Sequence, residues 1–272
     1  MEKNATGVYL FCIARSNLVG ELNASGLDVQ HPLSVFRHSP DLCAVVSEVA
    51  LKDFCGPEAE LCLQELGWIG PRAVNHEAVV EEVMACSPVL PARFGTLFSS
   101  QEKLRKFLDV HGEIITHYLD RIRGRSEWSV KGLLHRKQAQ QALLSKGLTD
   151  RRDDLAVLPP GTRYFEERRI QQEADKEFTH WLNQTCREVA GDLQNHASDF
   201  CECEKVPRER QENGVEEVLN WAFLLPEEAL PAFRESIRRM NFEHGPQGLR
   251  FELSGPWPPY RFVPPLSMDA VA

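Results

Sequence analysis

Three ionisable residues, His76, Glu77 and Arg93, form the most suggestive polar group in this sequence of 272 residues. His76 and Glu77 are adjacent in a segment with helical periodicity, and Arg93 follows in a segment with the alternation of a strand. An imidazole beside a carboxylate could act as a general acid and base, but no nucleophile or set of metal ligands accompanies this group. We therefore expect a structural network that ties the helix to the strand, because an unpaired buried polar group is costly.

The eight cysteines suggest two further kinds of chemistry, a zinc site and a thiol nucleophile. Cys201 and Cys203, with Cys186 and His196 nearby in sequence, lack the second pair at CxxC spacing that a zinc site needs, so we expect no metal. Cys86 ends an apolar helical segment without a protease signature, and we expect it to be inert. The common phosphate, dinucleotide and hydrolase motifs are also missing. The sequence therefore predicts no cofactor and no catalytic residues.

A helix followed by a strand must position the first polar group. Apolar and small residues recur at spacings of three and four from Ala73 to Ser87, which predicts a helix with one buried face. After Pro88 the chain becomes extended, with Leu90, Ala92 and Phe94 on one side, before Gly95 bends the backbone.

The remaining elements of the first half surround this unit. Residues 8–14 (VYLFCIA) are almost continuously apolar, which is typical of a central strand. Residues 33–36 and 42–49 predict a hairpin, and a short helix is expected at 58–66. A long amphipathic helix should begin at a capping box formed by Ser99 and Glu102 and should end near Gly124.

The second half has the element order βαββαβ, which is the ferredoxin-like signature. We expect an α+β protein of two domains, 1–124 and 125–272, the second a modified ferredoxin-like fold with a variable insertion at 136–161. Its expected elements are strand 127–134, a polar helical piece, helix 162–196, strands 200–206 and 215–224, helix 226–240 and strand 249–253.

A proline-rich segment with two aromatic residues, Trp257-Pro258-Pro259-Tyr260, follows the last strand. Prolines fix an extended backbone with few donors, and the aromatic rings bring large amphipathic surfaces. We expect a rigid strap whose aromatic residues pack on the ferredoxin-like sheet. A polyproline II ligand for a groove on a partner is the alternative.

The overall charge argues against nucleic acid and anionic lipid as partners. There are 31 basic and 40 acidic residues, which gives a net charge of -9. The longest apolar runs are far shorter than the roughly 20 residues that span a bilayer. Because the N-terminal residues also lack a secretory signal, we expect a cytosolic protein without a membrane contact.

Several segments together resemble the GvpL/GvpF family of gas vesicle proteins. In that family a helix with a His-Glu pair precedes a vLPxRFGT segment. The matching segments occur in the expected order and cover most of the chain: YLFCIAR, NHEAVVEEVMACSPVLPARFGTLFSS, SEWSVKGLL, VLNWAFLLP and RFELSGPWPPYRFV.

The resemblance implies a non-enzymatic structural or assembly protein of the gas vesicle, located at the vesicle within the cytoplasm. Its partners would be the hydrophobic shell protein and other accessory gas vesicle proteins. Candidate partner-binding or strap residues are Phe94, Gly95, Trp257, Pro258, Pro259 and Tyr260. Two alternatives remain open: a ferredoxin-like module that senses a small molecule or regulates a partner, and an enzyme that brings Cys86 or His76 next to another titratable group.

Overall fold

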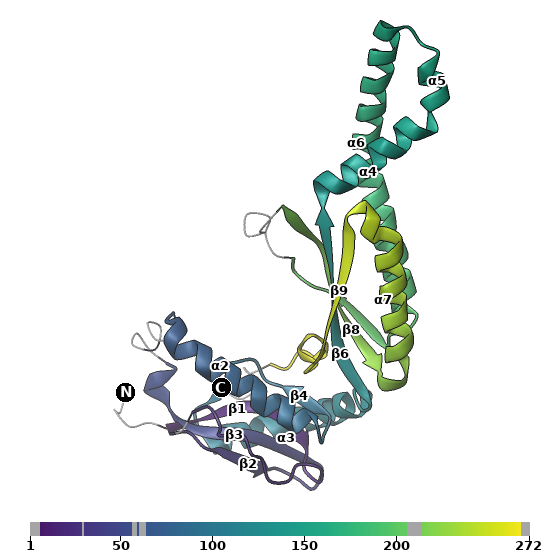
Figure 1. Cartoon of the computed structure of the whole chain (residues 1–272). Coiled ribbons are helices and arrows are strands. Elements are labelled where there is room, and N and C mark those ends of the chain that lie inside the picture. Colours follow the sequence, from purple (N-terminus) through teal and green to yellow (C-terminus); the bar gives the residue numbers. More distant parts are fainter. Residues whose placement is uncertain (1–5, 29, 56–58, 60–63, 206–213, 268–272) are drawn as a thin grey trace. The chain divides into compact units, whose positions relative to one another are not determined.

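The chain divides into two compact units, which are described separately (Figure 1). A computed structural model describes residues 6–28, 30–55, 59, 64–205 and 214–267. The first unit combines residues 1–126 with residues 256–272, and the second unit comprises residues 127–255. The expected boundary near Gly124 lies within two residues of the first division. However, the sequence assigned everything after that point to the second domain, whereas the C-terminal residues belong to the first unit.

The first unit is built on a five-stranded sheet with strand order β2-β3-β1-β4, in which β5 also pairs with β1. The predicted central strand and hairpin are confirmed, since β1 pairs with β3 on one side and β4 on the other, and β2 pairs antiparallel with β3. The elements are β1 (Thr6–Arg15), β2 (Leu33–Arg37), β3 (Leu42–Ala50), η1 (Leu51–Asp53), α2 (Leu66–Met84), β4 (Val89–Pro91), β5 (Leu97–Phe98), α3 (Gln101–Arg121) and η5 (Tyr260–Phe262).

Strand β1 is a long, almost fully buried strand at the centre of this unit. All of its residues after Thr6 are buried, and both α2 and α3 contact it. The register of β1 against β3 shifts between Leu10 and Cys12, which marks a β-bulge at Phe11. Tyr9, Phe11 and Cys12 all join the apolar cluster that includes the buried valines of α2. The bulge thus interrupts the alternation, so that the consecutive residues Phe11 and Cys12 both join this cluster.

Three local predictions for the first unit need correction. Helix α2 begins at Leu66 and runs through Pro71, which lies in its second turn and removes one backbone hydrogen bond without ending the helix. The LPARFGT strand is split into β4 and β5 by a turn at Gly95, whose φ is 83°. Ser100, not Ser99, caps α3 by accepting a hydrogen bond from the Lys103 amide. The helix predicted at 58–66 lies largely outside the described residues.

The second unit has a four-stranded sheet with the order β7-β8-β6-β9. The predicted strands all occur with shifted ends, and β7 pairs antiparallel with β8 as expected. The polar segment after the first strand is helical. The elements are β6 (Arg125–His135), α4 (Arg136–Asp150), α5 (Arg152–Ala156), α6 (Pro160–Gln194), β7 (Asp199–Glu202), β8 (Val215–Pro226), η3 (Glu227–Ala229), α7 (Leu230–His244), η4 (Gly245–Gln247) and β9 (Leu249–Trp257).

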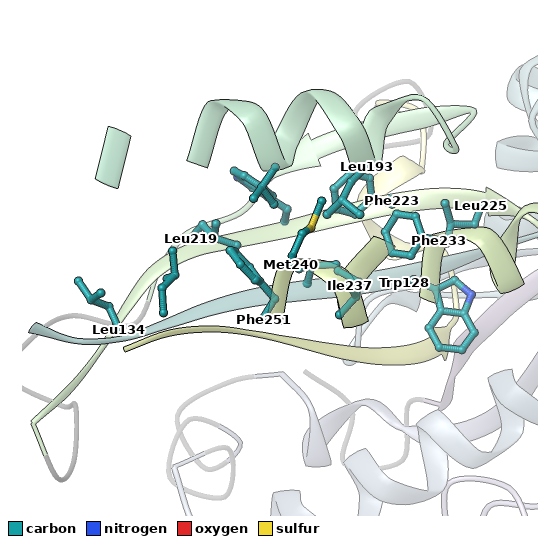
Figure 2. Packing of buried hydrophobic residues seen from close by; sticks show 14 of the residues in the cluster. Trp128, Leu134, Leu193, Leu219, Phe223, Leu225, Phe233, Ile237, Met240 and Phe251 are labelled. Atoms are coloured by element: carbon teal, nitrogen blue, oxygen red, sulfur yellow. The ribbon is translucent and has the colours of Figure 1, made fainter. Parts of the chain in front are cut away.

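The core of the second unit lies between this sheet and the helices α6 and α7 (Figure 2). Strand side chains such as Trp128, Phe223 and Phe251 meet Leu193 of α6 and Phe233 of α7. Gly132 leaves room for this packing, because a Cβ there would lie 2.6 Å from the Leu219 side chain. The first part of α6 extends beyond this core and packs with α4 and α5 instead.

Candidate functional site

His76, on the buried face of α2, is the centre of the polar group that the sequence singled out. Its Nε2 lies 3.0 Å from the carbonyl oxygen of Ala92, and its Nδ1 lies 2.8 Å from the hydroxyl of Tyr9. A carbonyl oxygen can only accept, so Nε2 carries the proton and Nδ1 accepts from Tyr9. Both ring nitrogens are therefore occupied. The imidazole joins α2 to β1 and to the residue that follows β4.

The turn of the RFGT sequence is attached to the same hydroxyl. The Gly95 amide donates to the Tyr9 oxygen over 3.3 Å, and the Thr96 amide and hydroxyl both donate to the Arg93 carbonyl. Glycine is needed here because L side chains rarely adopt a φ of 83°. We call the set formed by Tyr9, His76, the Ala92 carbonyl and the Gly95 amide the histidine hub.

Aromatic rings enclose the imidazole of the hub, which is buried. Phe11 stacks on His76 with ring centroids 5.4 Å apart, and Phe94 approaches it edge-on at 5.8 Å. Burial lowers the pKa of His76 to about 4, although its bond to the Ala92 carbonyl acts in the opposite direction. Burial also raises the pKa of Tyr9 above its ordinary value. The hub is therefore neutral at physiological pH.

The predicted network of His76, Glu77 and Arg93 does not form. Glu77 accepts a hydrogen bond from the Tyr260 hydroxyl over 3.0 Å, on a different side of α2 from the His76 ring. The Arg93 side chain is exposed, and no described residue forms a hydrogen bond or ion pair with its guanidinium. Consecutive helix positions point about 100° apart, and Arg93 is the first residue of the turn rather than part of a strand. These two facts separate the three side chains.

The C-terminal tail, residues 256–267, belongs to the first unit and contacts α3 beyond Trp257, the last residue of β9, whereas the sequence predicted that it would pack on the ferredoxin-like sheet. Tyr118 donates to the Pro259 carbonyl over 3.1 Å and Arg121 donates to the Phe262 carbonyl over 2.8 Å. Pro258 and Pro259 are buried, and Trp257 is 40% exposed. Gly255, inside β9, has a φ of 138°, and a Cβ there would lie 2.9 Å from the Glu127 carbonyl oxygen, so glycine is required at this position.

The tail and the hub lie close together in the first unit. Burial raises the pKa of Tyr260 above its ordinary value, and the Glu77 carboxylate, Cys12 and Tyr9 add to this effect. Tyr260 meets α2 at Glu77, the neighbour of His76 in the sequence. The predicted strap therefore reaches the helix that carries His76, and it does so through Glu77 and not through Arg93.

The cysteines do not assemble into a reactive or metal-binding group in the described part of the chain. No three His, Cys, Asp or Glu side chains there are placed to hold a metal ion. Cys186 and Cys203 both line an open groove of about 700 Å³ between α6 and β8, and burial raises the pKa of Cys186. His196 instead pairs with Ser236, and the exposed Cys86 bonds to the Val83 carbonyl.

Sequence reasoning missed Tyr9 and Tyr118, which carry the hydroxyls that organise this region. Both are buried, and each lies in an apolar stretch where it counts only as a core residue. A buried tyrosine needs a partner for its hydroxyl, so these positions could have been marked as hydrogen-bond donors. Their partners, 67 and 141 residues away, could not have been named.

Comparison with known proteins decides what kind of protein contains this arrangement. A family model described as "Gas vesicle synthesis protein GvpL/GvpF" matches residues 7–264. The chain belongs to the GvpL/GvpF family. The resemblance inferred from its motifs is thereby confirmed, and the family is not a known enzyme family.

Relatives of known sequence or structure agree with this membership. Gas vesicle protein L of Streptomyces sp. (strain CB03234) is 27% identical over 236 residues, which cover 85% of this chain and 83% of the relative. The crystal structure of GvpF from Anabaena sp. PCC7120 has a TM-score of 0.67 and 19% identity, and covers 95% of this chain and 98% of its own.

A second solved structure shows the same fold. GvpF from Microcystis aeruginosa has a TM-score of 0.65 and 18% identity, with 95% of this chain and 99% of its own chain covered. Because the sequence identities are below 20%, the two structures establish similarity of fold and nothing about function. In addition, none of the helices in the described residues is both long and apolar enough to pass through a membrane.

Proposed function

We propose that this protein takes part in gas vesicle assembly by binding the hydrophobic shell protein and other gas vesicle proteins, without catalysing a reaction. The family match over residues 7–264 is the observation that carries the proposal. A shell subunit with a large apolar face would aggregate unless another protein held it until assembly. The site of action is the gas vesicle within the cytoplasm.

The chemistry of the hub supports a structural role for its ionisable groups. A general base needs a nitrogen that can reach a substrate, but both nitrogens of His76 are engaged inside the protein. Its low pKa follows from burial and not from a neighbouring charge. Glu77 is likewise engaged with Tyr260. The hub holds a surface in place, and this favours a binding role over an acid or base role.

We place the partner surface on the first unit and assign to it the RFGT turn and the tail. Arg93 and Gly95 are exposed at the turn, while Phe94 is half-buried and held by Tyr9 and His76. At the tail Trp257 is 40% exposed. Rigid backbone with partly exposed aromatic and arginine side chains is typical of binding hot spots. This surface combines the candidate residues from both motifs.

The second unit, in this proposal, is a ferredoxin-like domain with residues 136–161 as an insertion. Without α4 and α5, its order is β6-α6-β7-β8-α7-β9, which is βαββαβ. The strand order β7-β8-β6-β9 is the order expected when the second strand of that motif lies at one edge and the fourth at the other. Both features support the assignment.

Co-purification of the full-length chain with the shell protein tests the proposed function. We expect Arg93→Glu and Trp257→Ser to reduce capture of the shell protein, because each removes a side chain of the proposed surface. Arg238→Glu, in an exposed ion pair on α7 of the second unit, is the matched control and should leave capture unchanged. Normal vesicle formation in cells that lack the protein would contradict the assembly role.

A further inference from the structure

The second unit carries a feature that the proposed function does not use. Helices α4 and α5 pack against the first part of α6, and together they form a helical arm, residues 136–175 (Figure 1). The arm contains an open groove of about 500 Å³. Its lining includes Leu144 and Leu148 of α4 and Tyr164, Glu167, Arg168 and Gln171 of α6.

The floor of this groove is apolar and incompletely covered. Leu144 and Leu148 are only half-buried, and the ring of Tyr164 is 56% exposed. Two packed helices cannot enclose an apolar stripe on their own, whereas four can. A concave surface with leucines and a tyrosine is therefore suited to another helical element.

The charges on α6 indicate which element fits. Tyr164, Glu167, Arg168 and Gln171 have the spacing i, i+3, i+4, i+7 and so share one helix face. A two-fold axis between positions 167 and 168 exchanges 164 with 171 and 167 with 168. In an antiparallel pair of α6 helices, Glu167 of each copy would then face Arg168 of the other.

We propose that the groove is a homodimer interface, in which α4 and the first part of α6 from two copies pack antiparallel into a four-helix bundle. The pattern is self-complementary, as a two-fold interface between identical chains requires. Glu167 already pairs with Arg163 over 2.9 Å, but that pair is exposed and contributes little, so Glu167 can also serve the second copy. The inference does not depend on binding of the shell protein.

Sedimentation equilibrium of the full-length chain tests this interface. We expect a reversible dimer. Leu148→Asp should abolish it, because a charge would enter the apolar floor. Glu167→Arg and Arg168→Glu should each weaken dimerisation by about tenfold, because each turns two attractive contacts into repulsive ones. Mixing these two single variants should restore the dimer as a heterodimer, since every opposed pair is then again of opposite sign.

The mixing experiment separates pairing between copies from effects within a helix. Changes inside one arm are the same whether a variant is alone or mixed, so only contacts across the interface can produce the rescue. Phe165→Ser removes a 73% exposed ring of α6 that does not line the groove, and it should leave the dimer intact. A chain that stays monomeric at all concentrations, or a dimer indifferent to the charge reversals, would overturn the proposal.

Discussion

The histidine hub and the helical arm are both rich in polar and aromatic residues, yet they are held together in opposite ways. In the hub, Tyr9 is fully buried and joins His76 to Gly95 across long distances in sequence. In the arm, several charged side chains of α6 pair with neighbours three or four positions along the same helix, as Arg163 does with Glu167 and Arg169 with Glu166, while Arg151 reaches Glu173 from outside this helix. Long-range hydrogen bonds specify the hub, whereas many of the polar contacts on α6 of the arm are local. The surface of the arm is therefore free to serve another purpose.

The largest effect expected from this contrast is the loss of the Tyr9 side chain. Tyr9→Ala removes a ring that touches Phe11, Phe54 and Phe94, and it leaves His76 and the Gly95 amide without their partner. We expect it to destabilise the first unit by about 4 kcal/mol. Tyr9→Phe keeps the ring and should cost only about 1 to 3 kcal/mol. Denaturant dependence of hydrogen exchange in β1 measures both, and equal costs would mean that the hydroxyl bonds dominate.

The second effect is a dependence of stability on pH that comes from the hub. His76 has a pKa of about 4 in the folded protein, against about 6.5 in an unfolded chain. The unfolded state therefore binds more protons between these values, and stability falls as the pH falls from about 6.5 toward 4. The loss amounts to as much as about 3 kcal/mol.

A comparison with His76→Phe isolates this contribution from that of carboxylates. Asp28 and Glu82 have pKa values lowered by hydrogen bonds, so their own contributions are lost at the acid end of the same range. Phenylalanine preserves the stack on Phe11 but cannot bind a proton. We expect the variant to be less stable at pH 7 and the difference from the natural chain to shrink on acidification. If the difference in the free energy of unfolding between the natural chain and His76→Phe, measured in urea, stayed constant from pH 7 to pH 4, this would be evidence against a buried neutral imidazole.

Much of the architecture could be predicted from local patterns. The apolar run at Val8–Ala14, the hairpin around Pro40 and the stripe of α3 each follow from residue periodicity, and the pairings of β1 with β3 and of β2 with β3 agree with them. The family was also identifiable, because its motifs are contiguous in sequence. These features depend on residues that are near one another along the chain.

The candidate site was predicted less well, because its geometry depends on contacts between distant residues. The bulge at Phe11 changes which residues of β1 face α2, and alternation alone gives no sign of it. Tyr260 reaches Glu77 across 183 positions, so the tail could not be assigned to the first unit. His76 is buried and has hydrogen-bond partners, as expected, but these partners are the Tyr9 hydroxyl and the Ala92 carbonyl. Tyrosines and backbone carbonyls occur throughout the chain, so the sequence could not indicate which of them His76 would bind.

A smaller effect is expected where the tail meets α2. Tyr260→Phe removes the hydroxyl that donates to Glu77 and should destabilise the tail by about 1 kcal/mol. In a double-mutant cycle with Glu77→Gln, the two changes should be less than additive, since either one alters the same contact. Limited proteolysis of the tail reports the change. Glu81→Gln changes an exposed carboxylate one turn further along α2 and is the control. If the effects of Tyr260→Phe and Glu77→Gln on stability were additive, this would count against the contact.

The smallest effect belongs to the arm and completes the contrast with Tyr9. Phe165 is 73% exposed and contacts the Tyr164 ring at a centroid distance of 5.8 Å. Phe165→Ala should change the free energy of unfolding by less than about 0.5 kcal/mol, because alanine favours the helix and the lost burial is small. The measurement is hydrogen exchange of the α6 amides as a function of urea concentration. A cost as large as that of Tyr9→Phe would show that the arm is specified by tertiary packing, and the difference between the two regions would then disappear.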